Sequence, residues 1–259
     1  MNKVVTLSNE VWKKFYTTII GNKFKEGTII KGKDLKGHIL CKILSEDLVM
    51  RDFQYKMGMN EDVNQLARKG SCGAGLHFCL VNDIYNYFDY GTKLAVVSVP
   101  DEEAVYVDDG KFRTHRLEIK KIMPFGETAT WEYLQENGAD ITILGSYAVI
   151  YAAACGCLEV VKYLQENGAD ITDENNLAVR CAAENGHLEV VKYLHEHGSD
   201  ITAYGNDAVV SAVKNGHLEV VKYLHKHGAD ITDQNDDALY WAAENDQTEV
   251  MEYLQANMQ

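Results

Sequence analysis

Four histidines near the C-terminal end of the chain have a spacing that could bind zinc. His195 and His197 form one His-x-His pair, and His225 and His227 form a second pair one repeat later. Imidazole nitrogens are common zinc ligands. The surrounding residues predict a helix, however, and side chains two residues apart on a helix point about 200° from each other. One histidine of each pair must face away, so no metal site is predicted here.

A second arrangement imitates a calcium-binding loop. Asp233, Asn235, Asp237 and Glu244 stand at the first, third, fifth and twelfth places of such a loop. The sixth place, where the loop needs a glycine for its sharp turn, holds Ala238. The segment from that alanine onward follows the helical pattern of the repeats described below. We therefore predict a repeat unit here, without metal or cofactor.

The N-terminal half contains one segment whose residue types could support catalysis. Residues 70–79 form a glycine-rich stretch that includes His77, and Tyr85 and Glu118 follow at a distance. A carboxylate can stabilise an oxocarbenium-like ribose in a transition state, and an aromatic ring can stack on nicotinamide. This order of a glycine-rich turn, a tyrosine and a late glutamate resembles that of the ADP-ribosyltransferase family. That family has a tyrosine where this chain has His77. The resemblance implies His77, Tyr85 and Glu118 as catalytic candidates.

The alternative for the same segment is structural. Residues 70–75 would then form a glycine-rich turn that leads into a packed strand, and Glu118 would be an ordinary strand residue. The sequence leaves both interpretations open, so the N-terminal half is an enzyme candidate only through this resemblance.

The composition indicates a chain that folds throughout. Of the 259 residues, 46% are hydrophobic and 25% are charged, and only two are proline. The chain begins with Met-Asn-Lys-Val-Val-Thr and shows no apolar run typical of a signal peptide or a membrane helix. Six cysteines without a Cys-x-x-Cys pair predict neither a disulfide framework nor a structural zinc site. We expect a soluble, intracellular protein.

Charge divides the chain into two unequal parts. Residues 126–259 carry 6 basic and 23 acidic side chains, whereas residues 1–125 carry the other 19 basic and 16 acidic ones. A net charge of -17 in the second part repels phosphate backbones and anionic lipids. The expected partner is therefore a protein, preferably a basic one, and neither nucleic acid nor membrane.

An internal repeat dominates the acidic part. The string Glu-Asn-Gly-Ala-Asp-Ile-Thr at 136–142 returns at 166–172, and close variants follow at 196–202 and 226–232. A second string, Gly-His-Leu-Glu-Val-Val-Lys-Tyr-Leu, occurs at 186–194 and 216–224. The period is 30 residues. Self-similarity of this length is typical of stacked supersecondary units.

Each unit predicts two helices and a turn, as residues 173–202 illustrate. The first helix is slim, with small residues around Cys181 at helical spacing, so neighbouring units can stack closely. Leu188, Val191 and Leu194 give the second helix its apolar stripe. Gly198 then ends that helix, because glycine enters the left-handed conformation without a steric penalty. The glycine and histidine at 186–187 separate the two helices and are predicted to be structural.

These strings resemble the ankyrin-repeat family, whose units carry a Gly-His-Leu-Glu-Val-Val second helix and end in Gly-Ala-Asp. The usual unit is three residues longer, and the missing residues fall between Thr202 and Ala208, so its β-hairpin finger should be shortened. Thirty-residue units resemble those of giant-virus, mimivirus-type, ankyrin proteins. The core from Cys72 to Phe78 resembles the N-terminal region that accompanies such repeats, and that resemblance implies no particular function.

The predicted fold is an α+β N-terminal domain followed by an all-α ankyrin-repeat solenoid. In the domain we expect a helix at 9–20, a short helix at 83–88, strands at 94–99, 104–107 and 117–122, and a hairpin turn at 108–110. The predicted boundaries are 1–125 for the domain and 126–259 for the repeats. The repeats consist of a half unit at 127–142, complete units at 143–172, 173–202 and 203–232, and a capping unit at 233–259. In the half unit, Trp131, Tyr133 and Leu134 are expected to point inward.

Positions that vary between units predict the binding surface, because the repeated residues serve mainly in stacking. Aromatic, cationic and acidic side chains occupy the same columns of successive first helices and turns, as in a partner-specific face. Two of them, Tyr240 and Trp241, fit equally well as filling for the terminal unit. The candidate binding residues are Tyr147, Ile150, Tyr151, Arg180, Asp207, Asp237, Tyr240 and Trp241.

Overall fold

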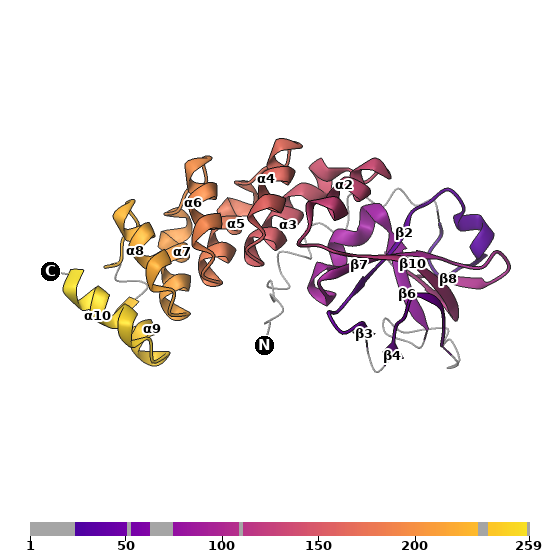
Figure 1. The fold of residues 1–259 in the computed structure, drawn as a ribbon, viewed down its shortest axis with the longest axis horizontal. Coiled ribbons are helices and arrows are strands. Elements are labelled where there is room, and N and C mark those ends of the chain that lie inside the picture. Colours follow the sequence, from indigo (N-terminus) through magenta and orange to yellow (C-terminus); the bar gives the residue numbers. More distant parts are fainter. Residues whose placement is uncertain (1–23, 51–52, 63–74, 109–110, 233–237, 258–259) are drawn as a thin grey trace. The chain divides into compact units, whose positions relative to one another are not determined.

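A computed structural model describes residues 24–50, 53–62, 75–108, 111–232 and 238–257. Contacts divide the chain into two compact units (Figure 1). The N-terminal unit comprises Met1–Phe125 and Ala129–Ala139, and the repeat unit comprises Gly126–Thr128 and Asp140–Gln259.

The N-terminal unit is built on an antiparallel sheet. Within the described residues its eight strands run in the order β1-β8-β9-β6-β2-β7-β10-β5. A separate two-stranded ribbon joins β3 to β4. The strands are β1 Ile29–Lys31, β2 Leu40–Leu44, β3 Val49–Met50, β4 Phe53–Gln54, β5 Gly58–Glu61, β6 Leu76–Leu80, β7 Lys93–Ser98, β8 Ala104–Asp108, β9 Lys111–Thr114 and β10 Arg116–Pro124.

The α+β prediction is confirmed, and the three predicted strands are β7, β8 and β10. The expected short helix is η2 (Val81–Tyr90), which is a 3-10 helix, and a second one is η1 (Gly32–Leu35). The predicted helix at 9–20 lies outside the described residues. So do residues 109–110 of the predicted turn, although the flanking Asp108 and Lys111 pair with each other.

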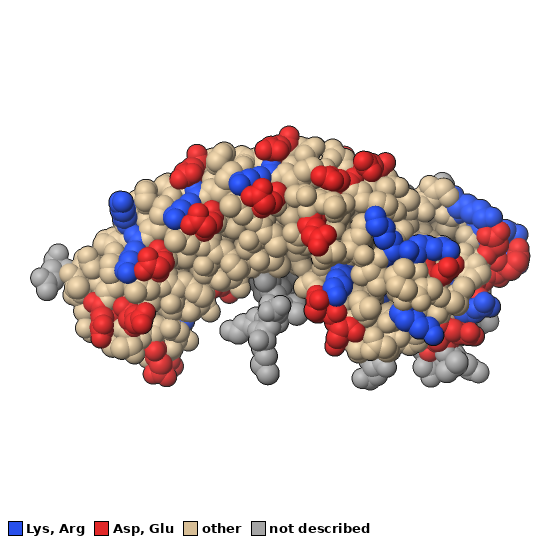
Figure 2. Space-filling view, in the orientation of Figure 1, with Lys and Arg blue, Asp and Glu red and all other residues tan. Residues whose placement is uncertain are grey.

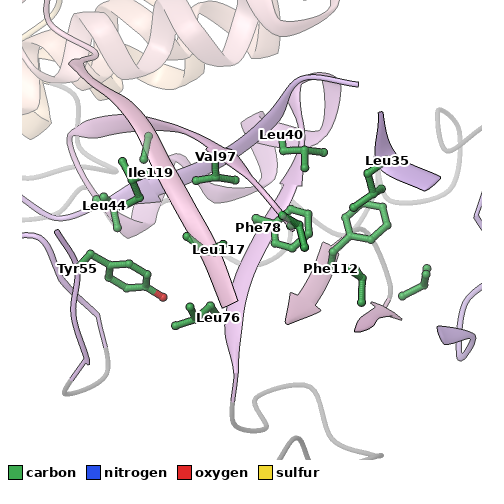
Figure 3. Packing of buried hydrophobic residues seen from close by; sticks show 14 residues of the cluster. Leu35, Leu40, Leu44, Tyr55, Leu76, Phe78, Val97, Phe112, Leu117 and Ile119 are labelled. Carbon is green, nitrogen blue, oxygen red and sulfur yellow. The ribbon is translucent and has the colours of Figure 1, made fainter. Parts of the chain in front are cut away.

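One face of the sheet carries a continuous apolar core (Figure 3). It follows from alternation: Leu40 and Leu44 of β2 are buried on the same face as Phe78 of β6 and Phe112 of β9. The two phenylalanine rings stack with their centroids 5.3 Å apart. Leu117 of β10 extends this core across the sheet.

Helix α2 (Thr128–Glu136) packs within the N-terminal unit. Trp131 is fully buried, and its indole Nε1 donates a hydrogen bond of 2.8 Å to the carbonyl oxygen of Phe125. Its ring centroid lies 5.9 Å from that of Phe88 in η2. Trp131 and Leu134 point inward as predicted, whereas Tyr133 is half-buried beneath the Lys121 ammonium. The contacts of these residues thus place the predicted half unit with the sheet.

The repeat unit consists of alternating first and second helices, confirming the solenoid prediction. First helices pack against one another in chain order, and second helices do the same (Figure 1). Among the described residues, no helix is long and apolar enough to cross a membrane. The first helices are α3 Ile141–Ala154, α5 Asp173–Glu184, α7 Ala203–Lys214 and α9 Ala238–Glu244; the second helices are α4 Leu158–Glu166, α6 Leu188–Glu196, α8 Leu218–Lys226 and α10 Thr248–Asn257.

The helix details follow the predicted pattern with one change. In α6 the buried residues are Val190, Val191 and Leu194, while Leu188 is only half-buried. Gly198 has the expected left-handed φ of 104° and follows the end of the helix. The amide of Ser199 then donates a 2.9 Å hydrogen bond to the carbonyl of Leu194.

In two units, the turn at the start of the first helix is compressed as predicted. In place of a hairpin finger, the three residues 204–206 all have left-handed φ and ψ angles, and so do residues 174–176. Each non-glycine residue in this conformation costs about 1 kcal/mol. The side-chain oxygen of Asn206 compensates in part, because it accepts a 2.9 Å hydrogen bond from the amide of Asp230 at the end of the same unit.

In two of the repeats a histidine bonds to the preceding repeat, as the structural interpretation predicted. The Nε2 atom of His217 lies 3.0 Å from the carbonyl oxygen of Glu184, and His187 makes the same contact with Ala154. The His217 ring covers Gly186, where an added Cβ would lie 2.5 Å from Nδ1. Glycine is required there both for its φ of 77° and for this close approach.

Two glycine substitutions separate these two requirements. Gly198→Ala should cost about 1 kcal/mol of unfolding free energy, because Gly198 has a left-handed φ but no atom within 4 Å of the added Cβ. Gly186→Ala should cost clearly more, since the same penalty is joined by a clash with the hydrogen-bonded His217 ring. Urea denaturation followed by circular dichroism would measure both. Equal losses would show that the ring moves aside freely.

The pH dependence of stability tests the structural role of His187. Burial lowers the pKa of His187, so the unfolded chain binds a proton more readily than the folded one. Stability should therefore fall as the pH drops below about 6.5, the ordinary histidine pKa. His187→Gln should reduce this loss between pH 7.5 and pH 5, because Gln247 occupies the equivalent position of the last unit and does not titrate. Identical pH slopes for both proteins would contradict this role.

Candidate protein-binding surface

Two of the predicted binding residues belong to the core. Tyr147 and Ile150 on α3 are only 8% and 2% exposed. Helix α3 is almost entirely apolar, so most of its side chains pack into the core of the stack. Val210, the equivalent of Ile150 in the third complete unit, is buried as well. Their assignment to a partner surface is corrected accordingly. Tyr151, the next residue, is half-buried.

A polar cluster joins the second and third complete repeats. Arg180 of α5 forms an ion pair with Asp207 of α7, and the two side chains are 23% and 32% exposed. The guanidinium carbon also lies 5.0 Å from the ring centroid of Tyr204. The tyrosine hydroxyl accepts a 3.2 Å hydrogen bond from Asn175 of the preceding turn. Two predicted residues are thus brought together, and they hold a third that was not predicted.

Tyr204 is the main functional candidate that sequence reasoning missed. Its side chain is 65% exposed even though contacts from the preceding repeat hold it on two sides. It stands in the left-handed turn with a φ of 56°, an uncommon conformation for a bulky residue. An aromatic residue in a turn position that is Glu174 one unit earlier could have been noticed in the sequence.

The last unit presents a second aromatic group. Tyr240 is 53% exposed, and its ring makes an edge contact of 5.3 Å with that of Trp241. The Lys214 ammonium lies 3.9 Å from the Trp241 ring centroid. Trp241 is therefore half-covered by the preceding unit, whereas Tyr240 faces solvent. The predicted Asp237 lies outside the described residues.

The second helices present a different, internally neutralised surface. Glu159, Glu189 and Glu219 each form an ion pair of 2.7 Å with the lysine three residues later. Figure 2 shows red acidic and blue basic side chains next to one another over the second helices. Because the glutamates and lysines come from repeated positions, this surface is nearly the same in α4, α6 and α8, whereas α10 has Glu252 in place of the lysine. It offers little by which a partner could be distinguished.

The turns on the first-helix side carry carboxylates in a different setting. An open hollow of about 510 Å³ lies between two successive turns, and Asp173 and Glu174 are among its lining residues. Asp170 and Asp200 also line it, and hydrogen bonds from the following threonines lower the pKa of both carboxyl groups. Within the described part of the chain, no ion pair joins these four residues to a cation.

The four histidines of the two His-x-His pairs serve other contacts. The Nδ1 atom of His195 lies 2.9 Å from the hydroxyl of Tyr223 in the next unit, and His225 pairs in the same way with Tyr253. His197 and His227 each bond a backbone carbonyl of their own helix. Within the described ranges, no group of three potential ligands could hold a metal ion. Of the calcium-like segment, residues 238–244 form helix α9 and 233–237 lie outside the description.

The sheet separates the catalytic candidates. Continuing the register of β6 with β2 places His77 level with Ile43, which pairs with Leu94, and Leu94 pairs with Met123 of β10. Glu118 stands five residues further along β10. Three strand spacings across the sheet and five residues along it amount to about 20 Å.

Catalysis by His77, Tyr85 and Glu118 acting together is therefore not supported. Glu118 forms an ion pair of 2.5 Å with Lys120 on its own strand, and the side chain of Tyr85 lies outside the described part. Leu76–Leu80 is instead the packed strand β6, preceded by Gly75 with a φ of 115°. The structural interpretation of this segment is the one that the fold supports.

Two family models match this chain. A stack of two-helix units with one uniform and one variable face defines a repeat protein for protein recognition. Residues 122–204 and 182–259 match the family model of ankyrin repeats, and residues 38–130 match a domain of unknown function, DUF7666. The chain belongs to the ankyrin-repeat family.

A viral relative extends this assignment. The chain is 31% identical over 131 residues to the uncharacterized protein R869 of Acanthamoeba polyphaga mimivirus, covering 46% of this chain and 92% of the relative. Together with the repeats, this similarity supports a giant-virus ankyrin-repeat protein. Ankyrin repeats imply protein–protein interaction, so the partner class is protein.

A double-mutant cycle tests whether Arg180 and Asp207 hold the variable face in place. Replacing each by alanine, singly and together, should give a coupling of about 1–2 kcal/mol in unfolding free energy, because both side chains are largely buried. The matched control is the Glu189–Lys192 pair, whose glutamate is 71% exposed; its coupling should stay below about 0.5 kcal/mol. Equal couplings in urea denaturation would count against a distinct role for the Arg180 pair.

Proposed function

We propose that this protein is an adaptor that holds another protein on the first-helix side of its ankyrin stack. The observation that carries the proposal is the contrast between its two faces. The second helices repeat the same neutralised Glu–Lys pairs, whereas the first helices and turns display different aromatic and charged side chains in successive units. A specific partner requires such differences, because identical positions offer it no unique register.

The charge of the repeat half indicates what kind of protein surface the partner presents. The repeat half carries a net charge of -17, from 6 basic and 23 acidic residues. Three of its lysines form ion pairs on the second helices and so do not neutralise the carboxylates of the turns. These turn carboxylates give the first-helix side a negative electrostatic potential. A basic protein surface would be attracted, and the attraction would weaken as salt screens it.

The mimivirus relative supports a viral setting for the proposed interaction. The partner would then be a protein of the virus or of its host, met in the host cytoplasm or in the virion. The name of the relative's virus makes extract of Acanthamoeba cells a rational source of candidate partners.

Affinity capture with matched variants tests the proposal. The immobilised full chain should retain a defined protein from extract of infected amoebae, with less retained as salt rises. Tyr240→Ala with Trp241→Ala should reduce recovery at least fivefold, as loss of an aromatic anchor does. Glu189→Gln with Glu219→Gln, on the second helices, should leave recovery within twofold. The opposite result, with recovery unchanged by the aromatic substitutions but reduced by the glutamate substitutions, would mean that the partner binds the second-helix face instead.

A further inference from the structure

The left-handed turn at residues 204–206 of α7 holds an exposed aromatic ring in a fixed position. Tyr204 is 65% exposed, and a tyrosine so exposed would ordinarily sample several rotamers. Here the Arg180 guanidinium lies 5.0 Å from the ring centroid, and Asn175 donates to the hydroxyl. Arg180 is itself held by Asp207. One face of the ring is thus supported from the preceding repeat while much of the side chain remains accessible.

Such an arrangement lowers the cost of binding. Ordering a side chain at an interface opposes association, and a ring that is ordered beforehand avoids most of that cost. Tyrosines are also enriched among the residues that dominate binding energy, because they combine a large contact area with few rotatable bonds. A held, exposed tyrosine on the variable face is therefore a natural anchor for a partner.

The surroundings of Tyr204 determine what chemistry could dock against it. Asn175, which bonds the tyrosine hydroxyl, also lines the hollow of about 510 Å³ between the turns. The same hollow is lined by four acidic residues, Asp170, Asp173, Glu174 and Asp200. Arg180 does not offset these charges, because Asp207 neutralises it. The hollow therefore repels phosphate or carboxylate groups and attracts cations.

We propose that Tyr204 and this acidic hollow receive an arginine or lysine side chain from an extended basic segment of the partner protein. The cationic head would enter the hollow, and its alkyl stem or guanidinium plane would lie on the exposed part of the ring. The inference rests on the proposed protein-binding function and specifies where and by what chemistry the partner is held.

The repeat geometry also sets a spacing for that segment. Successive packed helices lie about 8–10 Å apart, so equivalent turns follow at that interval. An extended chain advances about 3.3 Å per residue. A peptide with a cation at every third position would therefore place one cation near each successive turn. The test peptide is built on this spacing.

A synthetic peptide tests this directly. Fluorescein-labelled peptide of four Arg-Ser-Gly triplets would be titrated with the full chain and followed by anisotropy. A second peptide with citrulline in place of arginine keeps the shape and removes the charge. The arginine peptide should bind, with affinity falling as salt rises, and the citrulline peptide should bind at least tenfold more weakly.

Variants assign the binding to the site. Tyr204→Ala should weaken binding of the arginine peptide about fivefold, as loss of a cation–π contact and an anchor would. Tyr204→Phe keeps the ring and should stay within twofold. Asp173→Asn with Glu174→Gln should weaken binding at least threefold and flatten its salt dependence. Glu189→Gln with Glu219→Gln removes as many charges from the second helices and should change affinity less than twofold; circular dichroism melts would confirm that each variant is folded.

Three outcomes would overturn the inference. They are no binding of the arginine peptide, equal binding of the arginine and citrulline peptides, and an equal loss for the turn variant and the second-helix variant. If the peptide does not bind but the immobilised chain still captures a protein that requires Tyr240 and Trp241, this inference fails and the adaptor function stands. If no protein is captured by the wild-type chain, the adaptor function itself fails.

Discussion

Close stacking of successive repeats is the constraint on which the rest of the repeat unit depends. The first helices can approach because their facing positions hold small residues such as Ala178, Ala182 and Ala183. The inter-helix glycines leave room for the histidine ring of the next unit, which bonds back to the end of the preceding first helix. Each unit alone would leave its apolar side open to water, so the fold exists only as a stack.

The thirty-residue period narrows what the turns can do. With no residues to spare for a hairpin finger, the chain reverses through three left-handed residues, and the conformational cost is offset in part by a hydrogen bond from the end of the same unit. These turns bring side chains of neighbouring repeats together, and the contact between Arg180 and Tyr204 is one consequence. The variable face is thus a product of the same geometry that holds the stack together.

The N-terminal unit follows a different logic, because its core depends on pairing between distant strands. β1 and β8 are neighbours although about seventy residues separate them, and β5 pairs only with β10 at the other edge. Short strands of this kind carry little local signal, which is why β1, β2, β5 and β9 were not predicted while the apolar run of β7 was. Helix α2 resembles a repeat helix in sequence, but its buried tryptophan packs beside Phe88 and Phe125.

The sequence by itself determined the number and length of the repeats, their helices, their glycine ends and the acidity of the second half. Those features are local or periodic, and the periodic ones occur several times in the sequence at an interval of thirty residues. Only the tertiary structure decided which variable positions are exposed: Ile150 and Arg180 share a column, yet one is buried and the other pairs across repeats. It also decided that His77 and Glu118 stand far apart, since strand order and register depend on long-range pairing that no short motif encodes.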